Sequence, residues 1–280
     1  MRYRNGLLFA LILLFSQVGI VNGKPTLKAC GHHDYAPWNW LQDDKIVGVC
    51  AEVASELFGR LGYQVELTYV GPWKRCQQMI ESGEVDLNIC SFSNDQRKRY
   101  SVFSQTPMAS NENALFMRKG DYFDYTGLDS LDDKFVGLVR GVSLGNEIDT
   151  HLQQKSYVIR AENYHRLFAM LKLKRIDAVI IGRQSGQHLL NLYGLNTDIV
   201  AATTPLVKGD LYFSMSKQSS YITLHYITSL NDIESALQSP QYRVWLASLL
   251  ARYSAKHKAF IQRSKPVIDN TSNADVNRTQ

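Results

Sequence analysis

The sequence has few cysteines, no dense run of one charge, and no long apolar stretch after its first 23 residues. Four cysteines in 280 residues are too few to replace a hydrophobic core, which excludes a small scaffold held together by disulfides. The 31 Lys and Arg exceed the 26 Asp and Glu by only five, whereas nucleic-acid-binding domains usually concentrate basic charge. We therefore expect no nucleic acid among the partners of this protein.

The remaining composition is that of an ordinary globular protein. Apolar residues make up 45% of the chain, charged residues 20% and aromatic residues 11%, which excludes the disordered, collagen-like and coiled-coil classes. A length of 280 residues allows one large domain or two of modest size, each able to bury its own core.

The first 23 residues have the layout of a cleavable secretory signal. Arg2 and Arg4 precede an apolar run from Leu7 to Ile20, and Val21-Asn22-Gly23 has apolar or small residues at its first and third positions. The run is shorter than the roughly 20 residues that a membrane span needs. We expect a soluble chain exported to the periplasm, with residues 265–280 as a disordered polar tail.

All cysteines lie in the first half of the chain, at Cys30, Cys50, Cys76 and Cys90. Their separations of 20, 26 and 14 residues match no zinc-site spacing, and none forms a CxxC motif. An exported protein can keep disulfides, so we expect buried thiols or one or two structural bridges, with the pairing left open. The adjacent His32 and His33 would point in opposite directions in an extended segment, and we expect neither a metal nor another cofactor.

Strands and helices alternate along the predicted mature chain. Apolar runs and one-sided apolar spacing predict strands at 26–30, 64–70 and 85–90 and helices at 47–61 and 73–82. After a loop at 121–134, a second cycle has strands at 135–139, 157–160, 178–181 and 199–202 and helices at 144–152, 163–174 and 185–193. Helices are expected over most of 222–254. This order is typical of an α/β fold with mainly parallel sheets flanked by helices.

Two similar cycles separated by a loop indicate two lobes. Lobe 1 is expected at 24–113 and 211–264 and lobe 2 at 114–210, because the last helices return to the first cycle. Two crossings, near 112–118 and 208–216, would form a hinge. The carboxyl ends of the parallel strands would then face each other across a cleft, the usual place for a small-molecule site.

Aromatic residues are concentrated near the ends of the first two strands. Tyr35 could stack on a ligand with its ring face, whereas Trp38 and Trp40 could equally line the pocket or fill the core beneath the loop. Trp73 opens the second helix and is either a second aromatic wall or a plug between helix and sheet.

The densest polar cluster follows the third strand. Ser91 offers a hydroxyl group, and Arg97 offers a planar guanidinium that can hold a carboxylate through two charge-assisted hydrogen bonds. The neighbouring Lys98 and Arg99 are expected to face solvent.

Six short segments occur in a distinctive order, namely DYAPW at 34–38, GEVD at 83–86, SFSNDQR at 91–97, Phe103-Ser104, LDDKFVGLVRG at 131–141 and KRIDAVIIG at 174–182. Together they resemble the bacterial extracellular solute-binding proteins of family 3. The resemblance implies two lobes that close on a ligand, and a role in feeding ABC importers for polar amino acids.

The resemblance also implies roles for particular residues. Tyr35 and Trp73 would sandwich the ligand, and Arg97 would clamp its carboxylate. Ser91 would line the first lobe. Residues from Gly141 to Ser143 would add donors of the second lobe at a helix start, where free N–H groups favour an anion.

One position departs from the family pattern. Amino-acid binders of this family usually have an Asp five residues after the Asp of the RIDA-like stretch, where it holds the ligand's ammonium group. Here that position is Gly182, followed by Arg183, which cannot pair with an ammonium group. With Arg97, Arg140 and Arg183 all near predicted strand ends, we expect Arg183 to help complete the cage around a ligand that has more negative charge or no amine.

An enzyme is the rival interpretation. Residues 141–145 fit GxSxG between a predicted strand and helix, the setting of a hydrolase nucleophile, with Ser143 as the serine. Asp177 with His188 or His225 could complete a triad, and a dehydratase on the same fold is a further alternative. In a two-lobed binding protein, the glycines of this segment would instead form a tight turn at the start of a helix that faces the ligand. We therefore expect binding without catalysis.

The expected function is capture of a small polar or anionic, amino-acid-like solute by a monomeric periplasmic protein. The partner would be an ABC permease or, as the alternative, a membrane sensor that recognises the closed form. Both would use closure as the signal, so the sequence leaves this choice open.

Overall fold

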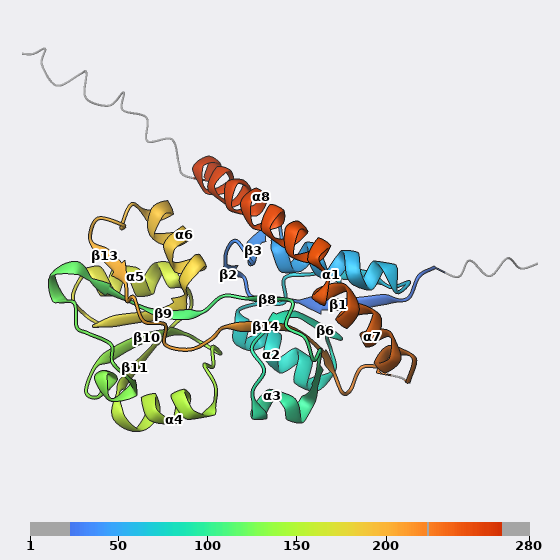
Figure 1. Ribbon diagram of the computed structural model, residues 1–280, viewed down its shortest axis with the longest axis horizontal. Helices are drawn as coiled ribbons and strands as arrows, with labels where there is room; N and C mark the ends of the chain where they lie inside the picture. Colours follow the sequence, from blue (N-terminus) through green and yellow to red (C-terminus); the bar gives the residue numbers. More distant parts are fainter. Residues whose placement is uncertain (1–22, 223, 265–280) are drawn as a thin grey trace, which may run out of the picture.

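Two α/β lobes lie side by side and are joined by extended segments that run between them (Figure 1). The computed structural model describes residues 23–222 and 224–264. The predicted tail and all of the predicted signal segment except Gly23 lie outside these residues. In the described part of the chain, no helix has the length and apolar character needed to cross a membrane. The two-lobed α/β fold expected from the sequence is the fold that the structure has.

The sheet of lobe 1 joins parallel strands to antiparallel ones. Its order is β5 (Gln64–Leu67), β1 (Thr26–Cys30), β6 (Leu87–Ser91), β14 (Asp210–Ser216) and β7 (Ser101–Phe103), and β8 (Ala109–Ser110) also pairs with β14. Strands β5, β1 and β6 are parallel, whereas β14 is antiparallel to its neighbours. The helices of this lobe are α1 (Val49–Arg60), α2 (Trp73–Ser82), α3 (Asp95–Tyr100) and α7 (Leu224–Gln238).

The sheet of lobe 2 has the same mixed design. Its order is β11 (Tyr157–Ala161), β10 (Phe135–Val139), β12 (Ala178–Gly182), β9 (Asn113–Arg118) and β13 (Ile199–Ala201). The first three are parallel, and β9 is antiparallel to β12 and β13. Its helices are α4 (Asn146–Lys155), α5 (Tyr164–Lys172) and α6 (Arg183–Tyr193), with 3-10 turns at Lys119–Asp121 and Leu128–Leu131.

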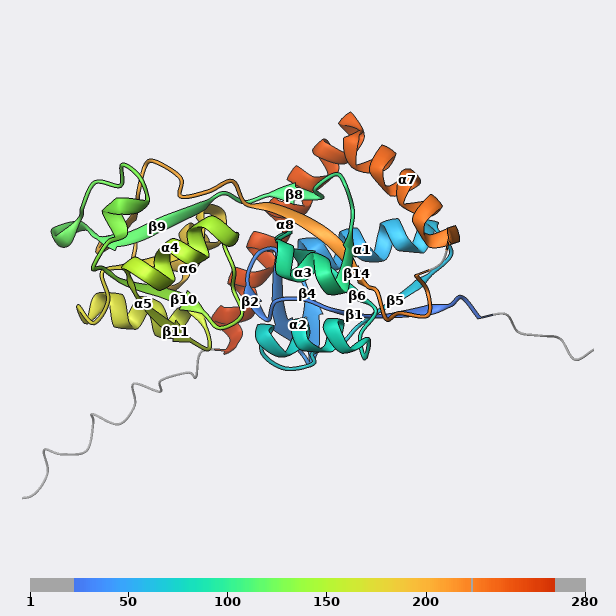
Figure 2. The same ribbon diagram turned by 90° about the horizontal axis from the view of Figure 1, so that it is seen from below.

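The hinge consists of two segments that hydrogen-bond to each other where the chain passes between the sheets (Figure 2). Asn113 donates its backbone N–H to Val207 O at 2.9 Å, and Asn111 donates to Gly209 O at 2.8 Å. A Cβ on Gly209 would lie 1.8 Å from Asn111 O, so only glycine allows this approach. The two crossings therefore form one narrow ladder, and their strands β9 and β14 supply the antiparallel part of each sheet.

The segment after β1 differs from the loop expected there. It forms a small antiparallel sheet of β2 (Asp34–Tyr35), β3 (Asn39–Gln42) and β4 (Lys45–Val47). Trp38 and Trp40 are almost fully buried in it, and Trp40 packs against Tyr253 and His257. Of the two interpretations, the tryptophans take the core position, since burying these large side chains stabilises the short strands.

Two disulfides connect the helices of lobe 1 to its sheet. Cys30 at the end of β1 is bonded to Cys76 in α2, and Cys50 in α1 is bonded to Cys90 in β6. The sequence separations within the pairs are 46 and 40 residues. Both bonds lie close to the strand ends that face lobe 2, so they hold α1 and α2 against the edge of the sheet where the candidate site is built.

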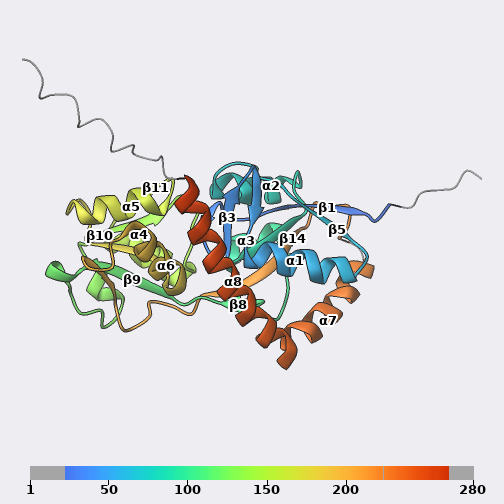
Figure 3. The ribbon, with the colours of Figure 1, turned by 90° about the horizontal axis from the view of Figure 1, so that it is seen from above.

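The last helix reaches across the boundary between the lobes. Helix α8 (Pro240–Ser264) packs on α1, where Glu52 accepts hydrogen bonds from Arg252 and Tyr253, and continues to α6 of lobe 2 (Figure 3). There His188 Nε2 and His257 Nδ1 lie 2.7 Å apart, so one imidazole donates to the other. Burial and the nearby His188 lower the pKa of His257 to about 4, and burial also lowers the pKa of His188. Both rings are therefore neutral at pH 7 and link α8 to lobe 2.

Removing either disulfide is expected to lower the free energy of unfolding by about 2–4 kcal/mol. The loops they close are of similar length, so the two losses should be similar. Urea unfolding, followed by circular dichroism, compares the wild type with Cys30→Ser/Cys76→Ser and Cys50→Ser/Cys90→Ser. An unchanged midpoint in either double variant would contradict this expectation.

Acidification is expected to weaken the link between α8 and α6. An unfolded histidine titrates near pH 6.5, whereas folded His257 titrates near 4, so between these values the unfolded chain binds the extra proton. As the pH is lowered through this window, the free energy of unfolding should decrease by up to about 1.4 kcal/mol per pH unit. The melting temperature of His257→Phe should fall less than that of the wild type between pH 7 and 4.5. The exposed His165, replaced by Phe, serves as control, and equal slopes in all three proteins would refute the assignment.

Candidate functional site

An interlobe cavity lies at the carboxyl ends of the parallel strands. Its walls come from the ends of β1 and β6 and the starts of α2 and α3 in lobe 1, and from the β10–α4 loop and the start of α5 in lobe 2. Its volume is about 30 Å³ because side chains of both lobes meet there. Five of the predicted site residues line it, namely Tyr35, Trp73, Ser91, Arg97 and Ser143.

Arg97 is buried where the two lobes meet. Asn94 caps α3 by accepting the backbone N–H of Arg97 at 2.8 Å, which places this residue in the first turn after β6. The guanidinium donates from Nη1 to Phe92 O at 2.9 Å and from Nη2 to Gly141 O of lobe 2 at 3.1 Å. Burial lowers its pKa, but an arginine remains charged at neutral pH. Among the described residues no carboxylate accepts a hydrogen bond from it.

The carbonyl group of Gly141 joins the two lobes. It accepts a hydrogen bond from Trp73 Nε1 at 3.1 Å as well as the one from Arg97, whose guanidinium carbon lies 5.5 Å from the centre of the Trp73 ring. Gly141 has a φ of 84°, and a Cβ there would lie 2.9 Å from Lys74 Cα. The backbone at Gly141 thus offers lobe 1 an acceptor in this conformation, whereas the sequence led us to expect donors.

Ser143 is held by polar partners from both lobes. Its Oγ accepts from Asn94 Nδ2 of lobe 1 at 2.8 Å and donates to Asp149 of α4. No described imidazole hydrogen-bonds to it. Asp177 precedes β12 and accepts the N–H of Phe135 at 2.8 Å, at the opposite end of the sheet from Ser143. The hydrolase triad is therefore not assembled from Ser143, Asp177 and His188, and the side chain of His225 lies outside the described part.

Tyr35 contacts the start of α6 through the hinge. Its Oη accepts from Asn111 Nδ2 at 2.8 Å, and the same amide nitrogen is 3.2 Å from Ser185 Oγ. Burial raises the pKa of Tyr35, so the phenol is neutral. This cluster crowds Gly182, because a Cβ there would lie 2.2 Å from Asn111 Nδ2 and 2.4 Å from Tyr35 Oη. No side chain fits at Gly182 unless this cluster moves.

His32 occupies the slot that a ligand was expected to fill. Its ring is stacked on Trp73 at 5.3 Å and on Tyr164 at 6.0 Å, and it lies 5.7 Å from Tyr35. The predicted sandwich of a ligand between Tyr35 and Trp73 is thus filled by an imidazole of the protein in this conformation. Nδ1 accepts the backbone N–H of Asp34 at 3.0 Å, and burial lowers the pKa of His32 well below its ordinary value. The ring is neutral and has its proton on Nε2.

Three buried polar atoms on the cavity wall have no hydrogen-bond partner in the described structure. They are His32 Nε2, Ser91 Oγ and Asn113 Nδ2, on residues that are no more than 5% exposed. A buried donor without a partner costs free energy, so groups of this kind usually meet a ligand or ordered water.

Arg183 lies away from the cavity and is fully used at the hinge. Its guanidinium pairs with Glu112 and donates to Ala202 O at 2.8 Å and Thr203 O at 3.2 Å. Arg183 is the first residue of α6, directly after Gly182, and its side chain extends toward the crossing segments and not toward the cavity. Arg140 is also outside the cavity and pairs with Glu162.

A wider groove adjoins the cavity on the other side of the β10–α4 loop. Its volume is about 760 Å³, and Val142 and Ser143 line both spaces. Three of its lining side chains are cationic, those of Lys74, Arg140 and Arg160, and one is acidic, that of Asp149. The approach to the interlobe site from this side is therefore predominantly positive.

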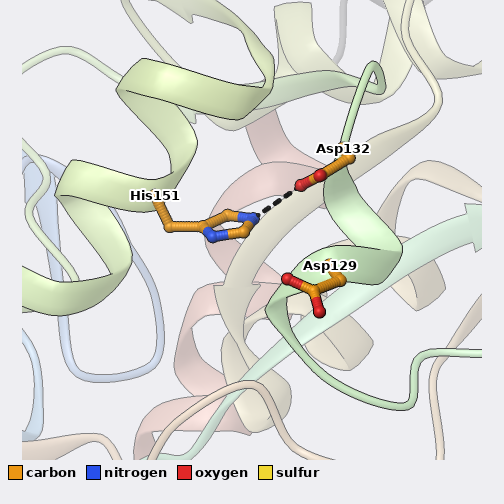
Figure 4. A group of neighbouring side chains, drawn as sticks. All are labelled: Asp129, Asp132 and His151. Carbon is orange, nitrogen blue, oxygen red and sulfur yellow. Dashed lines mark ion pairs between the residues drawn. The ribbon is translucent and has the colours of Figure 1, made fainter.

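One group of potential metal ligands occurs among the described residues, away from the cavity. Asp129, Asp132 and His151 lie between the 3-10 turn Leu128–Leu131 and α4, with their ligand atoms within 4.8 Å of one another (Figure 4). Asp132 Oδ1 and His151 Nε2 are 2.9 Å apart and form an ion pair when the imidazole is protonated. This pairing accounts for the geometry without an ion, and none of the three lines the interlobe cavity.

Several residues in or beside the cavity were not predicted from the sequence. Asn111 and Asn113 belong to the first crossing and follow no parallel strand. Tyr164 opens α5 after β11, but it lies on the apolar face of that helix with Leu167 and Phe168, which the sequence does not distinguish from core. Asn94 lies within the predicted polar cluster, but its hydrogen bond to Ser143 depends on how the lobes meet.

Comparisons with known proteins agree with this architecture. The family model described as bacterial extracellular solute-binding proteins, family 3, matches residues 27–187. The arginine-binding extracellular protein ArtP of Bacillus subtilis (strain 168) is 28% identical over 172 residues, which are 59% of this chain and 64% of that protein. The match thus spans less than two thirds of this relative's length.

Solved structures show the same fold at low sequence identity. The amino acid ABC transporter substrate-binding protein AbpA from Streptococcus pneumoniae, bound to L-arginine, has a TM-score of 0.63 and 23% identity, covering 83% of this chain and 95% of that one. An ancestral arginine-binding protein bound to arginine has a TM-score of 0.66 and 19% identity, covering 81% and 99%.

Crowding at Gly182 is expected to make even a methyl group destabilising. Gly182→Ala should lower the free energy of unfolding by about 1–3 kcal/mol, and the loss should shrink in an Asn111→Ala background. Urea unfolding of the two single variants and the double variant measures this coupling. Gly120→Ala is the control, because nothing lies within 4 Å of its Cβ position. Additive losses would show that Asn111 does not crowd position 182.

Proposed function

Because this chain belongs to the bacterial extracellular solute-binding proteins of family 3, we propose that it captures a small polar or anionic solute between its lobes for an ABC-type importer. We divide the lobes at 24–113 with 211–264 and at 114–210, which agrees with the strand order of the two sheets. The protein acts as a monomer in the periplasm, where the signal at 1–23 delivers it. Its partners are the solute and the permease, and nucleic acid is not among them.

The buried guanidinium of Arg97 is the observation that supports this proposal most strongly. Its hydrogen bonds go to the neutral carbonyl groups of Phe92 and Gly141, one from each lobe. The carboxylate of Asp149 acts on this charge electrostatically but accepts no hydrogen bond from it. A carboxylate on a bound solute would accept such bonds directly, and charge-assisted bonds are stronger than those to neutral carbonyl groups. The same solute would contact both lobes and so favour the closed state over the open one.

Binding without turnover is the chemistry that the side chains favour. The hydroxyl of Ser143 is engaged by Asn94 and Asp149, and no described imidazole hydrogen-bonds to it as a nucleophilic serine requires. Capture by closure requires only donors, acceptors and a hinge, all of which are present in the described chain.

The names of the relatives indicate an amino-acid-like solute. ArtP is named as arginine-binding, and AbpA was solved with L-arginine. The part of such a solute most consistent with this site is its carboxylate, because Arg97 is the buried cation on the cavity wall.

Protein isolated from the periplasm without refolding should carry a solute that depends on Arg97. Native mass spectrometry of the wild type is expected to show an adduct in about one-to-one ratio, which is identified after release. Arg97→Ala should lose it, because truncating one partner of a buried charge pair costs about 2–5 kcal/mol.

Arg99→Ala is the matched control, since Arg99 is on the same helix but exposed. Retention of the adduct in Arg97→Ala, or its loss in both variants, would remove Arg97 from the binding site. A wild type that carries no solute from any growth medium would argue against capture itself.

A further inference from the structure

We infer that the interlobe site is selective for a compact carboxylate without an ammonium group. This inference rests on the proposed capture function and narrows it to one class of solute. It follows from the polar groups on the cavity wall, from the crowding at one glycine, and from the charge of the adjoining groove.

The polar groups of the cavity wall with free hydrogen-bonding capacity are donors or can act as donors. His32 has its proton on Nε2, Asn113 presents its amide nitrogen, and Ser91 presents a hydroxyl, and all three lack a partner. The charged donor Arg97 lies on the same wall. A solute that accepts hydrogen bonds from several directions satisfies this set, and a carboxylate with its two oxygens does so.

The cavity wall has no acidic side chain that could hold an ammonium group. Its lining residues include no Asp or Glu. The nearest acid on the β10–α4 side, Asp149, already accepts from Ser143 and from the backbone N–H of Leu144 at 3.0 Å. On the other side, Asp34 accepts the backbone N–H of Tyr164 at 2.7 Å. An ammonium group moved into this site would lose its water and meet no carboxylate on the cavity wall, which is unfavourable.

The structure also prevents a carboxylate from being supplied at position 182. Tyr35 Oη and Asn111 Nδ2 occupy the space in which a side chain at Gly182 would begin. Both are neutral, and they hydrogen-bond to each other at 2.8 Å. The packing of the hinge therefore excludes an acidic side chain at this position. Replacing Gly182 alone would not introduce one without displacing Tyr35 and Asn111.

Aromatic packing restricts the size of the solute. The ring of His32 fills the space between Trp73 and Tyr164, where a long side chain of a solute would otherwise lie. The cavity of about 30 Å³ has to enlarge by separation of the lobes for any organic acid, and a small acid requires the least movement. The groove lined by Lys74, Arg140 and Arg160 would raise the local concentration of anions at its entrance.

Matched pairs of acids that differ only in the ammonium group test this inference. Isothermal titration calorimetry on the full exported chain uses propionate against L-alanine, succinate against L-aspartate and glutarate against L-glutamate, with L-arginine as a cationic probe. Any solute that copurifies is first removed by dialysis in mild denaturant. At least one amine-free acid should bind at least tenfold more tightly than its amino-acid partner, and L-arginine should bind more weakly still.

A change of charge on the cavity wall gives a second readout. Asn113→Asp places a carboxylate where a donor was and should weaken binding of the amine-free acid at least tenfold. Asn191→Asp, at an exposed position on α6, should leave that binding unchanged. Ser91→Ala, which removes one donor without adding charge, should weaken binding several-fold and replaces Asn113→Asp if circular dichroism shows that variant to be unfolded.

The outcomes separate this inference from the proposed function. If the amino acid of each pair, or L-arginine, binds as tightly as the amine-free acids, selectivity against ammonium groups is wrong while solute capture stands. If none of the seven probes binds, the inference is also wrong, and a solute recovered from the periplasmic protein would still support capture. Equal weakening by Asn113→Asp and Asn191→Asp would remove Asn113 from the site.

Discussion

The interaction on which the interlobe site depends is the burial of one guanidinium where the two lobes meet. Arg97 donates to a carbonyl of each lobe and lies over the ring of Trp73, so it is part of both the wall of the cavity and the contact that holds the lobes together. A buried cation with only neutral acceptors is unfavourable on its own. The rest of the site positions this charge on a cavity of about 30 Å³, which an anion can reach when the lobes separate.

Several elements hold that charge in position, and they come from distant parts of the sequence. The disulfides fix α1 and α2 to the ends of β1 and β6, the side chain of Asn94 caps the helix that carries Arg97, and the paired crossings set the distance between the sheets. Helix α8 adds a contact outside the hinge through His188 and His257. Opening of the lobes must therefore break polar contacts at the cavity and also strain or break the link between α8 and α6.

Membership of a solute-binding family establishes the kind of protein but leaves the solute to be argued from the site. Relatives and structural neighbours are named for arginine or were solved with it, yet this cavity has donors and no acidic wall. A shared fold with 19–23% identity is compatible with such a change, because specificity depends on a few side chains at the strand ends. The crowding of Gly182 by Tyr35 and Asn111 is the local feature that keeps a side chain out of position 182.

The sequence alone determined the alternation of strands and helices, because apolar periodicity is a local property of each segment. It also predicted that Arg97, Trp73 and Ser91 lie at one edge of the sheet, since they follow predicted strands or open helices, and all three line the interlobe cavity. Only the tertiary structure decided that Arg183 pairs with Glu112 outside the cavity and that His32 fills the slot beside Trp73. It also decided that Asn113 lines the cavity and that Asn111 hydrogen-bonds to Tyr35. These facts depend on how two sheets meet across a hinge, and contacts between segments so far apart leave no periodic signal in the chain.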